Sequence, residues 1–334
     1  MEPLVSILIP AYNAQEWIAE TIESALRQTW ARKEIIIVDD GSKDQTLAAA
    51  RRFASHNVAV ISHENQGAAA TRNLALASCQ GDYIQWLDAD DLLAPNKIES
   101  QMVAAQQCGV RTLISGPWGA FRFRVSKARF SATPLCADLS PVEWLLRKMG
   151  QNLHMQTATW LTSRQLTETA GPWNTNLLSD DDGEYFCRVL LASNGVRFVP
   201  EARVFYRITG SSRLSHIGFS QRKIDAMFLS MQLHIRYIRS LEDSERVRAA
   251  CVQYMQNWLM VFYPERMDIV VQLRELAEEL GGRLNDPKVR WKYSWIDRLF
   301  GLETAKRAQV VLPGAKASVI NAWDKALHRM GINL

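Results

Sequence analysis

Three carboxylates stand close together in the segment IQWLDADDLL, which covers residues 84–93. Asp88, Asp90 and Asp91 follow directly after an apolar run, where mutual repulsion and desolvation make ionised groups costly. We therefore expect a positive charge beside them. Carboxylate oxygens are the usual ligands of hard divalent cations, and Mg²⁺ or Mn²⁺ commonly bridges one or two carboxylates to substrate phosphates. The alternative is an acidic cap on the following helix, which the helix dipole would favour.

Two further polar segments have the same chemical character. In VDDGSKDQT (38–46), Asp39 and Asp40 precede a glycine suited to a turn. A carboxylate there would accept hydrogen bonds from a base N–H or from ribose hydroxyls, unless the segment is a plain strand–turn–helix corner. In ENQGAAATRN (64–73), a glycine begins an alanine-rich stretch, and Arg72 is available to a phosphate. An alanine-rich helix packed tightly on a sheet would look similar.

The first half of the chain alternates β-branched runs with longer helix-compatible segments, which is typical of parallel strands joined by crossover helices. Helical patterns cover 14–28, 44–54 and 67–77. In open α/β sheets, ligands bind beyond the carboxyl ends of the strands. The segments PAYN, DDGS, HENQG and DADD follow those ends, so we expect one site there. The predicted strands are VSILIP (5–10), EIIIVD (34–39), VAVIS (58–62) and YIQWLD (83–88).

Composition places the chain among globular proteins, because 334 residues with 47% apolar content can fill a sizeable core. Its five cysteines form no CxxC pair and no zinc pattern, which favours reduced thiols in a cytosolic protein. The N-terminal apolar run is too short for a signal peptide, and no stretch reaches membrane-spanning length. From about residue 214 helical periodicity replaces the strand pattern, and residues 214–334 hold 18 Lys+Arg against 13 Asp+Glu.

The four motifs PAYN, VDDGS, NQGAAATRN and DADD, in this order, resemble the family 2 glycosyltransferases over about residues 4 to 210. The resemblance implies a GT-A fold, an α/β architecture whose mostly parallel nucleotide-binding sheet is flanked by helices. It also implies a nucleotide-sugar donor, a divalent Mn²⁺ or Mg²⁺ ion, and inversion at the anomeric carbon. The expected catalytic domain is 1–213, with a nucleotide-sugar-binding half (1–110) and an acceptor-binding half (111–213). Residues 214–334 form a C-terminal helical region outside the resemblance.

The resemblance also assigns roles to residues of the first four motifs. Asp39 and Asp40 would contact the base and the ribose. Asp88 and Asp90, with Ala89 between them, match the family's DxD motif. Asp90 is then the first choice as metal ligand, and Asp88 would reach the ribose or a metal-bound water. Arg72 would lie near the nucleotide or diphosphate. The first nucleotide-contacting loop would consist of Pro10, Ala11, Tyr12 and Asn13.

A second acidic cluster lies in LLSDDDGEYFCRVL (177–190). The family places a carboxylate pair at a helix start, with an arginine about two turns later, and its second acid is the catalytic base. Aligning on Arg188 makes Asp182 the predicted base, although a third acid beside the pair keeps Asp181 open. Such a base must lie within hydrogen-bond reach of the acceptor hydroxyl. The alternative is a solvated acidic helix cap.

Several acceptor-side and diphosphate-side assignments stay open at the level of sequence. Trp173 could stack on an acceptor sugar or lie in the core, and His154 could contact the acceptor or serve the structure. Near the leaving diphosphate, the family often places a histidine or basic group. The candidates here, which the sequence does not rank, are Arg207, Ser211, Ser212, Arg213 and His216.

These features predict an enzyme that transfers a sugar, from a UDP-sugar on grounds of family frequency, to a hydroxyl of a glycan or lipid-linked glycan. Surface polysaccharide biosynthesis is the expected setting, in the cytoplasm or at the inner face of the plasma membrane, with no nucleic acid partner. The alternative is a non-catalytic GT-A-like binding or assembly protein, although none of the key acids is missing. A sugar-phosphate nucleotidyltransferase is disfavoured because PAYNAQEW lacks a glycine-rich phosphate loop with a lysine.

The C-terminal region contains DPKVRWKYSWIDRLFGL (286–302), whose spacing predicts one helical face. Basic residues accompany that face, so the helix could lie on an anionic membrane surface. The favoured alternative is that it packs its tryptophans on the catalytic domain or on a second subunit, because apolar stripes usually face a core. The predicted face consists of Trp291, Trp295, Leu299 and Leu302, and the basic residues are Lys288, Arg290, Lys292 and Arg298.

Overall fold

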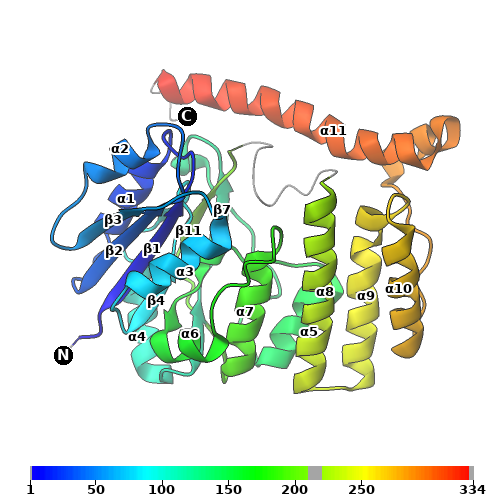
Figure 1. Cartoon of the computed structure of the whole chain (residues 1–334), viewed down its shortest axis with the longest axis horizontal. Helices are drawn as coiled ribbons and strands as arrows, with labels where there is room; N and C mark the ends of the chain where they lie inside the picture. Colours follow the sequence, from blue (N-terminus) through cyan, green and yellow to red (C-terminus); the bar gives the residue numbers. More distant parts are fainter. Residues whose placement is uncertain (1, 210–219, 331–334) are drawn as a thin grey trace.

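The computed structural model describes residues 2–209 and 220–330 and has a mixed α/β architecture (Figure 1). Its main sheet has the strand order β3-β2-β1-β4-β9. The first four of these strands run parallel, and β9 is antiparallel to β4. The four predicted strands are therefore confirmed, although β4 ends two residues earlier than predicted. Their bounds are β1 Val5–Ala11, β2 Lys33–Asp39, β3 Val58–Ser62, β4 Tyr83–Trp86 and β9 Thr162–Ser163.

Helices cover both faces of this sheet because successive strand side chains point to opposite faces. On β1, Ile7 and Ile9 enter a core with Ile22 and Ile98. Leu8, between them, enters a second core. The crossover helices are thus held by alternating strand residues. They are α1 Ile18–Leu26, α2 Thr46–Arg51, α3 Ala68–Ser78 and α4 Lys97–Cys108.

Two smaller sheets complete the strand arrangement, one of order β10-β6 and one of order β5-β11-β7-β8. Strand β11 pairs antiparallel with β5 and parallel with β7. Because β5 directly follows the DADD turn, this pairing brings residues 204–207 against the acidic segment. The bounds are β5 Leu92–Leu93, β6 Thr112–Ser115, β7 Trp118–Phe121, β8 Arg129–Phe130, β10 Gly195–Phe198 and β11 Val204–Arg207, with short 3₁₀ turns η1 Val125–Lys127 and η2 Thr157–Thr159.

The C-terminal region is helical, as predicted, and it packs on the second half of the sheet domain. Met231 and Leu259, from two of its helices, share one hydrophobic core with Trp144 and Phe186. The predicted division at residue 213 therefore does not separate two cores. The helices of this core are α5 Pro141–Gln151, α6 Arg164–Ala170, α7 Asp181–Ala192, α8 Gln221–Leu241, α9 Glu245–Phe262 and α10 Met267–Glu279.

The chain ends with the 3₁₀ turn η3 (Trp291–Tyr293) and the long helix α11 (Ser294–Arg329). In Figure 1, α11 runs across one end of the molecule, from above α9 and α10 back toward the main sheet. Lys325 near its far end contacts Glu16, which follows β1, at 3.2 Å. Among residues 2–209 and 220–330, no helix combines the length and hydropathy needed to cross a membrane.

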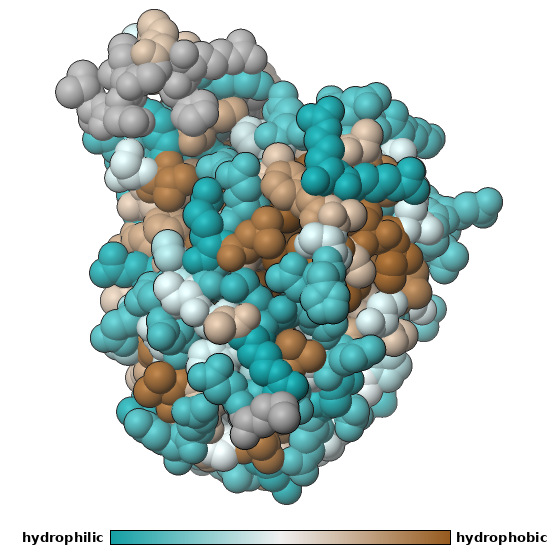
Figure 2. Space-filling model, turned by 90° about the vertical axis from the view of Figure 1, so that its left-hand side faces the viewer, coloured by the Kyte–Doolittle hydropathy of each residue, from teal (hydrophilic) through white to brown (hydrophobic). Residues whose placement is uncertain are grey.

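Surface character varies around the molecule. The side that carries the β3 edge of the sheet is largely hydrophilic, with hydrophobic groups gathered across its middle (Figure 2). Large apolar side chains are also exposed at the beginning of α11, where Trp291 and Leu299 are 84% and 70% accessible. Interior packing does not account for such exposure.

Candidate active site

The loops after β1 and β2 are tied together by Asn13. Its backbone N–H donates to Ser42 Oγ, and its side-chain Oδ1 accepts from the Lys43 N–H, each at 2.9 Å. Asn13 has a φ of 48°, a left-handed conformation that asparagine tolerates better than most residues. Of the predicted nucleotide-contacting loop, Pro10 and Ala11 end strand β1, and Tyr12 is 46% exposed beside them. The structure thus places this loop at the carboxyl edge of the sheet.

Asp39 ends β2 with one carboxylate oxygen satisfied and the other unsatisfied. Its Oδ2 accepts from the Ser42 N–H and from the Ser62 hydroxyl, both at 3.2 Å. Its Oδ1 is buried and meets no hydrogen-bond donor within residues 2–209 and 220–330. A buried acceptor without a partner is costly, so a ligand that donates a hydrogen bond there would remove a penalty. This arrangement fits the predicted base contact of Asp39.

Asp40 instead has its oxygens engaged by the loop before α3. They accept from the backbone N–H groups of Gln66 at 2.8 Å and Gly67 at 3.1 Å. Asn65 Nδ2 adds a third hydrogen bond at 3.1 Å. Gly41 is needed between these loops, because it has a φ of 67° and a Cβ there would lie 2.8 Å from the Asn65 nitrogen. Asp40 therefore organises the loop, and its ribose contact stays a prediction.

Arg72, on α3, links the DADD turn to the second acidic cluster. Its Nη2 lies 3.1 Å from Asp88 Oδ1, and its Nη1 lies 2.6 Å from Asp181 Oδ2. Burial alone would lower the pKa of this guanidinium, but the two carboxylates raise it above its usual value. The positive charge expected beside DADD is thus supplied in part by the protein. The same contact unites residues from α3, the end of β4 and the start of α7.

Trp173 lies in the core, and the prediction that it stacks on an acceptor sugar is wrong. The side chain is 2% exposed and stacks on the Tyr185 ring with centroids 4.1 Å apart. Its other role is to support Arg72, whose guanidinium lies 4.5 Å from the ring centroid. His154, by contrast, is exposed and its ring centroid lies 5.1 Å from that of Trp118, so an acceptor contact there stays a prediction.

Asp182 and Asp181 differ in their surroundings at the start of α7. Asp182 Oδ2 accepts a hydrogen bond from the Thr157 hydroxyl at 3.2 Å, whereas Asp181 is held by Arg72. Burial, helped by the charges of Asp181 and Asp180, raises the pKa of Asp182 to about 7. A general base is most effective when its pKa lies near the operating pH. This geometry favours Asp182 over Asp181 as the base, and the assignment stays a prediction.

Asp91, the third acid of DADD, belongs to the core. It is fully buried, and it accepts hydrogen bonds from the Gln156 side chain and, at 2.8 Å, from the backbone N–H of Arg207. Burial and the charges of Asp90 and Asp88 raise its pKa well above the usual carboxyl range. Sequence analysis did not separate Asp91 from its neighbours. The feature of the sequence that could have indicated its burial is its position directly before the apolar residues Leu92 and Leu93.

Arg207, a candidate for contacting the leaving diphosphate, also has a structural role. It is 1% exposed and lies between the rings of Trp17 and Phe121, 4.5 Å from each centroid. Its Nε donates to the carbonyl oxygen of Asp90 at 2.7 Å, and its Nη2 pairs with Glu20 at 2.6 Å. Arg207 therefore positions the acidic turn. Ser211, Ser212, Arg213 and His216 lie outside the described residues.

Replacing Asp91 by Ala should destabilise the protein by roughly 2–6 kcal/mol, because two buried hydrogen-bond donors would each lose their acceptor at a cost of about 1–3 kcal/mol. The Arg207 N–H and the Gln156 side chain would both lose that acceptor. Urea unfolding followed by circular dichroism measures the change. Asp297→Ala, on α11, is the matched control. If Asp91→Ala lowered the free energy of unfolding by less than about 1 kcal/mol, water would be replacing the carboxylate as hydrogen-bond acceptor.

The C-terminal helix α8 holds the first turns of α7, a contact that sequence analysis did not predict. Ser230 Oγ donates to Asp180 Oδ2 at 2.6 Å, and Tyr237 Oη donates to Glu184 Oε1 at 2.8 Å. Glu184 also pairs with Arg188 at 2.8 Å. Asp181 and Asp182 lie between these two anchored acids. The C-terminal region therefore fixes the helix that carries the predicted base.

The residues present fit a divalent ion that is shared with a ligand. Within residues 2–209 and 220–330, no group of three or more His, Cys, Asp and Glu side chains could hold a metal alone. Asp90 and Asp88 nevertheless offer carboxylate oxygens at the strand end, and Asp90 Oδ2 is 3.3 Å from the Thr209 hydroxyl. Mg²⁺ is usually bound by one or two carboxylates together with substrate phosphates, so this donor set is sufficient.

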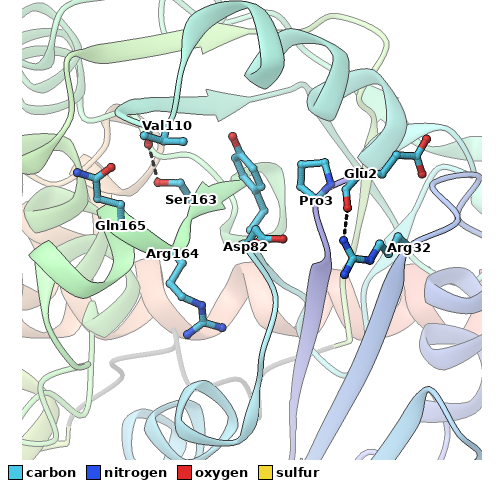
Figure 3. A pocket seen from close by; sticks show the side chains of 9 residues that line it. Glu2, Pro3, Arg32, Asp82, Val110, Ser163, Arg164 and Gln165 are labelled. Carbon is cyan, nitrogen blue, oxygen red and sulfur yellow. Dashed lines mark hydrogen bonds between the residues drawn. The ribbon is translucent and has the colours of Figure 1, made fainter.

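A cavity elsewhere on the molecule lies at the opposite edge of the main sheet. Pro3, Asp82 and Arg164 line it, and Arg32 in the same cavity donates to the Glu2 carbonyl oxygen (Figure 3). Asp82 directly precedes β4, whereas Asp88 follows it. The cavity is therefore separated from the acidic site by the length of a strand, and we assign it no part in the chemistry.

The fold and the acids at its strand ends define a GT-A type glycosyltransferase architecture. The crystal structure of Staphylococcus aureus TarS residues 1–349 with UDP-GlcNAc superimposes with a TM-score of 0.69 at 16% identity, covering 83% of this chain and 82% of that one. The complex of the same protein with UDP gives a TM-score of 0.61. Residues 6–149 match the family described as Glycosyl transferase family 2. This match confirms the resemblance seen in the motifs.

Curated relatives match about 30% of the chain. An uncharacterised glycosyltransferase of Rickettsia typhi is 44% identical over 100 residues, and the chondroitin synthase of Escherichia coli is 46% identical over 99 residues. An E. coli UDP-Glc:alpha-D-GlcNAc-diphosphoundecaprenol beta-1,3-glucosyltransferase is 40% identical over 100 residues. Each match covers 29–30% of this chain, and the chain covers 31%, 14% and 40% of the three relatives.

Proposed function

We propose that this protein transfers a sugar from a nucleoside diphosphate sugar to a hydroxyl group of a glycan or lipid-linked glycan, with inversion at the anomeric carbon. The observation that carries the proposal is the Arg72 bridge, which joins Asp88 of the DADD turn to Asp181 beside the predicted base. The predicted donor-side and acceptor-side acids are thereby held at one site. This supports the proposal because an inverting displacement needs the base and the departing diphosphate at the same site, with the base acting on the face opposite the diphosphate.

In this mechanism each group has a distinct task. Asp182 removes the proton of the acceptor hydroxyl, and its pKa of about 7 keeps much of it ionised near neutral pH. Arg72 and Arg207 hold the acidic turn in place from its two sides. Asp90, together with Asp88, would bind a Mn²⁺ or Mg²⁺ ion, which supplies positive charge to offset that of the diphosphate. Asp39 Oδ1, which has no hydrogen-bond donor among the described residues, would accept a hydrogen bond from the nucleotide base.

A UDP-sugar is the proposed donor, and a lipid-linked glycan made for surface polysaccharide is the proposed acceptor. Uracil presents an imide N–H, which is the kind of donor that the buried Asp39 Oδ1 lacks. The names of a relative and of a structural neighbour give further support, since they specify UDP-Glc with a diphosphoundecaprenol acceptor and UDP-GlcNAc. The five unpaired cysteines fit a reducing cytoplasm as the setting.

Donor screening tests the proposal. The purified protein with Mn²⁺ is tested for thermal stabilisation by nucleoside diphosphates and nucleotide sugars, because a ligand that binds only the folded state raises apparent stability. The stabilising donors are then assayed for hydrolysis. Release of the nucleoside diphosphate supports a glycosyltransferase, and release of pyrophosphate contradicts it. Stabilisation without any turnover, also in the presence of lipid-linked glycans, would favour a non-catalytic binding protein instead.

A further inference from the structure

A cluster of large apolar side chains is exposed where η3 meets α11. We call it the tip patch; it consists of Trp291, Trp295, Leu299 and Phe300, which are 84%, 57%, 70% and 64% exposed. Two tryptophans and two further large apolar residues this close together are unusual on a solvent-facing surface. The predicted packing of these tryptophans on the catalytic domain is therefore wrong. The single continuous face predicted over 286–302 is wrong as well, because the helix begins at Ser294 and breaks at Gly301.

The tip patch is exposed because other residues of the same segment hold it to the body. Val289, Ile296 and Ala305 are buried together, and Met260 of α9 and Leu302 pack against them. Lys306 Nζ donates to the carbonyl oxygen of Tyr263 at 2.7 Å. The segment thus has an inner face that anchors it and an outer face that carries the aromatic residues. Such two-sidedness is what an interfacial amphipathic element requires.

Basic residues surround the tip patch. Lys288, Arg290, Lys292 and Arg298 are all exposed, and the stretch 288–300 contains one acid, Asp297. No ion pair of these four cations occurs within the described parts of the chain. The surface therefore combines aromatic side chains with uncompensated positive charge. Anionic phospholipid headgroups complement this combination, since each nearby Lys or Arg adds to the attraction while tryptophan favours the interface.

A second copy of the chain is a poorer occupant of the patch. In a two-fold symmetric contact the same surface meets itself, so the four cations of each copy would face those of the other. Nothing in the stretch 288–300 besides Asp297 would offset that repulsion. A layer of anionic headgroups has no such conflict. Charge complementarity therefore favours a membrane surface.

Three further large apolar residues are exposed along α11 and directly after it, toward the active site. Leu312, Trp323 and Met330 are exposed by 52%, 67% and 61%, at spacings of eleven and seven residues that bring them to one side of a helix. The far end of α11 is held near the strand ends of the active site, because Asp324 pairs with Arg124 at 2.8 Å and Lys325 with Glu16. A surface bound along α11 would lie at the site's edge of the molecule (Figure 1).

We propose that η3 and α11 form a peripheral membrane-binding element that inserts the tip patch among anionic lipid headgroups. The element would hold the active site at the surface where a lipid-linked acceptor resides, and in this respect the inference rests on the proposed function. Binding itself depends on the tip patch and its cations. It can therefore be measured without any donor or acceptor.

Vesicle co-sedimentation of the full chain tests the proposal. The protein should sediment with vesicles of equal parts phosphatidylcholine and phosphatidylglycerol at low salt, but not with phosphatidylcholine alone, and high salt should release it. Trp295→Ala with Leu299→Ala should weaken binding at least roughly tenfold, and so should Lys292→Glu with Arg298→Glu. Val103→Ala, at an exposed apolar residue of α4, is the matched control and should bind like the wild type.

The outcomes separate this proposal from its rivals and from the proposed function. Absence of wild-type binding to the anionic vesicles at low salt would overturn the membrane-binding element. So would a concentration-dependent dimer, seen by light scattering, that Trp295→Ala abolishes, because the patch would then bind a second copy. Donor hydrolysis in solution and the thermal unfolding midpoint should be unchanged in the tip-patch variants. If the wild-type protein did not hydrolyse any donor, the enzyme assignment would be contradicted. Vesicle binding would still be measured independently, so the two proposals can fail separately.

Discussion

Asp182→Asn is expected to reduce sugar transfer by roughly 10²-fold or more, the usual scale for removing a positioned acid–base group. Asparagine keeps the volume of the side chain and its hydrogen bond with Thr157, but it cannot accept the acceptor's proton. Donor binding should be nearly unchanged, because the variant leaves Arg72 and the DADD turn intact. Steady-state transfer kinetics and a thermal-shift titration of the donor measure the two effects separately.

The pH dependence of the same reaction provides a second readout. The pKa of Asp182 is raised to about 7, and the base works only when ionised, so kcat/KM should rise with pH through that region and then level off. Asp182→Asn should lose this rise. Asp297→Asn, on α11, is the control and should retain it. If Asp181→Asn were inactive and Asp182→Asn retained activity, the base would be Asp181, and our assignment would be off by one position.

Asp90→Asn is expected to lower divalent-dependent turnover at limiting Mn²⁺ by about 10²-fold or more, because a bound metal ion contributes several kcal/mol of charge stabilisation. The substitution removes one ligand charge and little volume, and Arg207 contacts the backbone carbonyl of Asp90, which remains. The fold should therefore persist. Turnover measured across a Mn²⁺ titration, together with the unfolding midpoint, distinguishes loss of metal affinity from loss of structure.

Saturating Mn²⁺ sharpens this test. A variant that has only weaker metal binding should recover part of its turnover as Mn²⁺ rises, whereas the Asp297→Asn control should follow the wild-type curve throughout. Wild-type-like activity of Asp90→Asn at limiting Mn²⁺ would contradict its role as a metal ligand. Asp88 would then be the next candidate, although its pairing with Arg72 makes it harder to substitute without disturbing the Asp181 contact.

The local pattern of the sequence was sufficient for the four parallel strands of the main sheet, for the helices between them, and for the edge of the sheet where the candidate site lies. β-branched runs such as EIIIVD can satisfy both buried faces of a parallel strand, so β2 and its neighbours were predicted within a few residues. Polar segments directly after such runs must lie at the carboxyl edge, wherever the helices go. The helical character of the C-terminal region followed in the same way from its periodicity.

The partners of the polar side chains depended on tertiary packing, because a charged group can be paired only with what the fold brings near it. Arg72 reaches Asp181 only because α3 and α7 meet over Trp173. Asp91 is buried because β11 closes over the DADD turn. Likewise, Trp295 was predicted on an apolar stripe, but whether that stripe faced inward depended on the break at Gly301 and on Val289 and Ile296 occupying the inner side. Side-chain burial of this kind is a property of long-range contacts, which residue spacing along the chain does not specify.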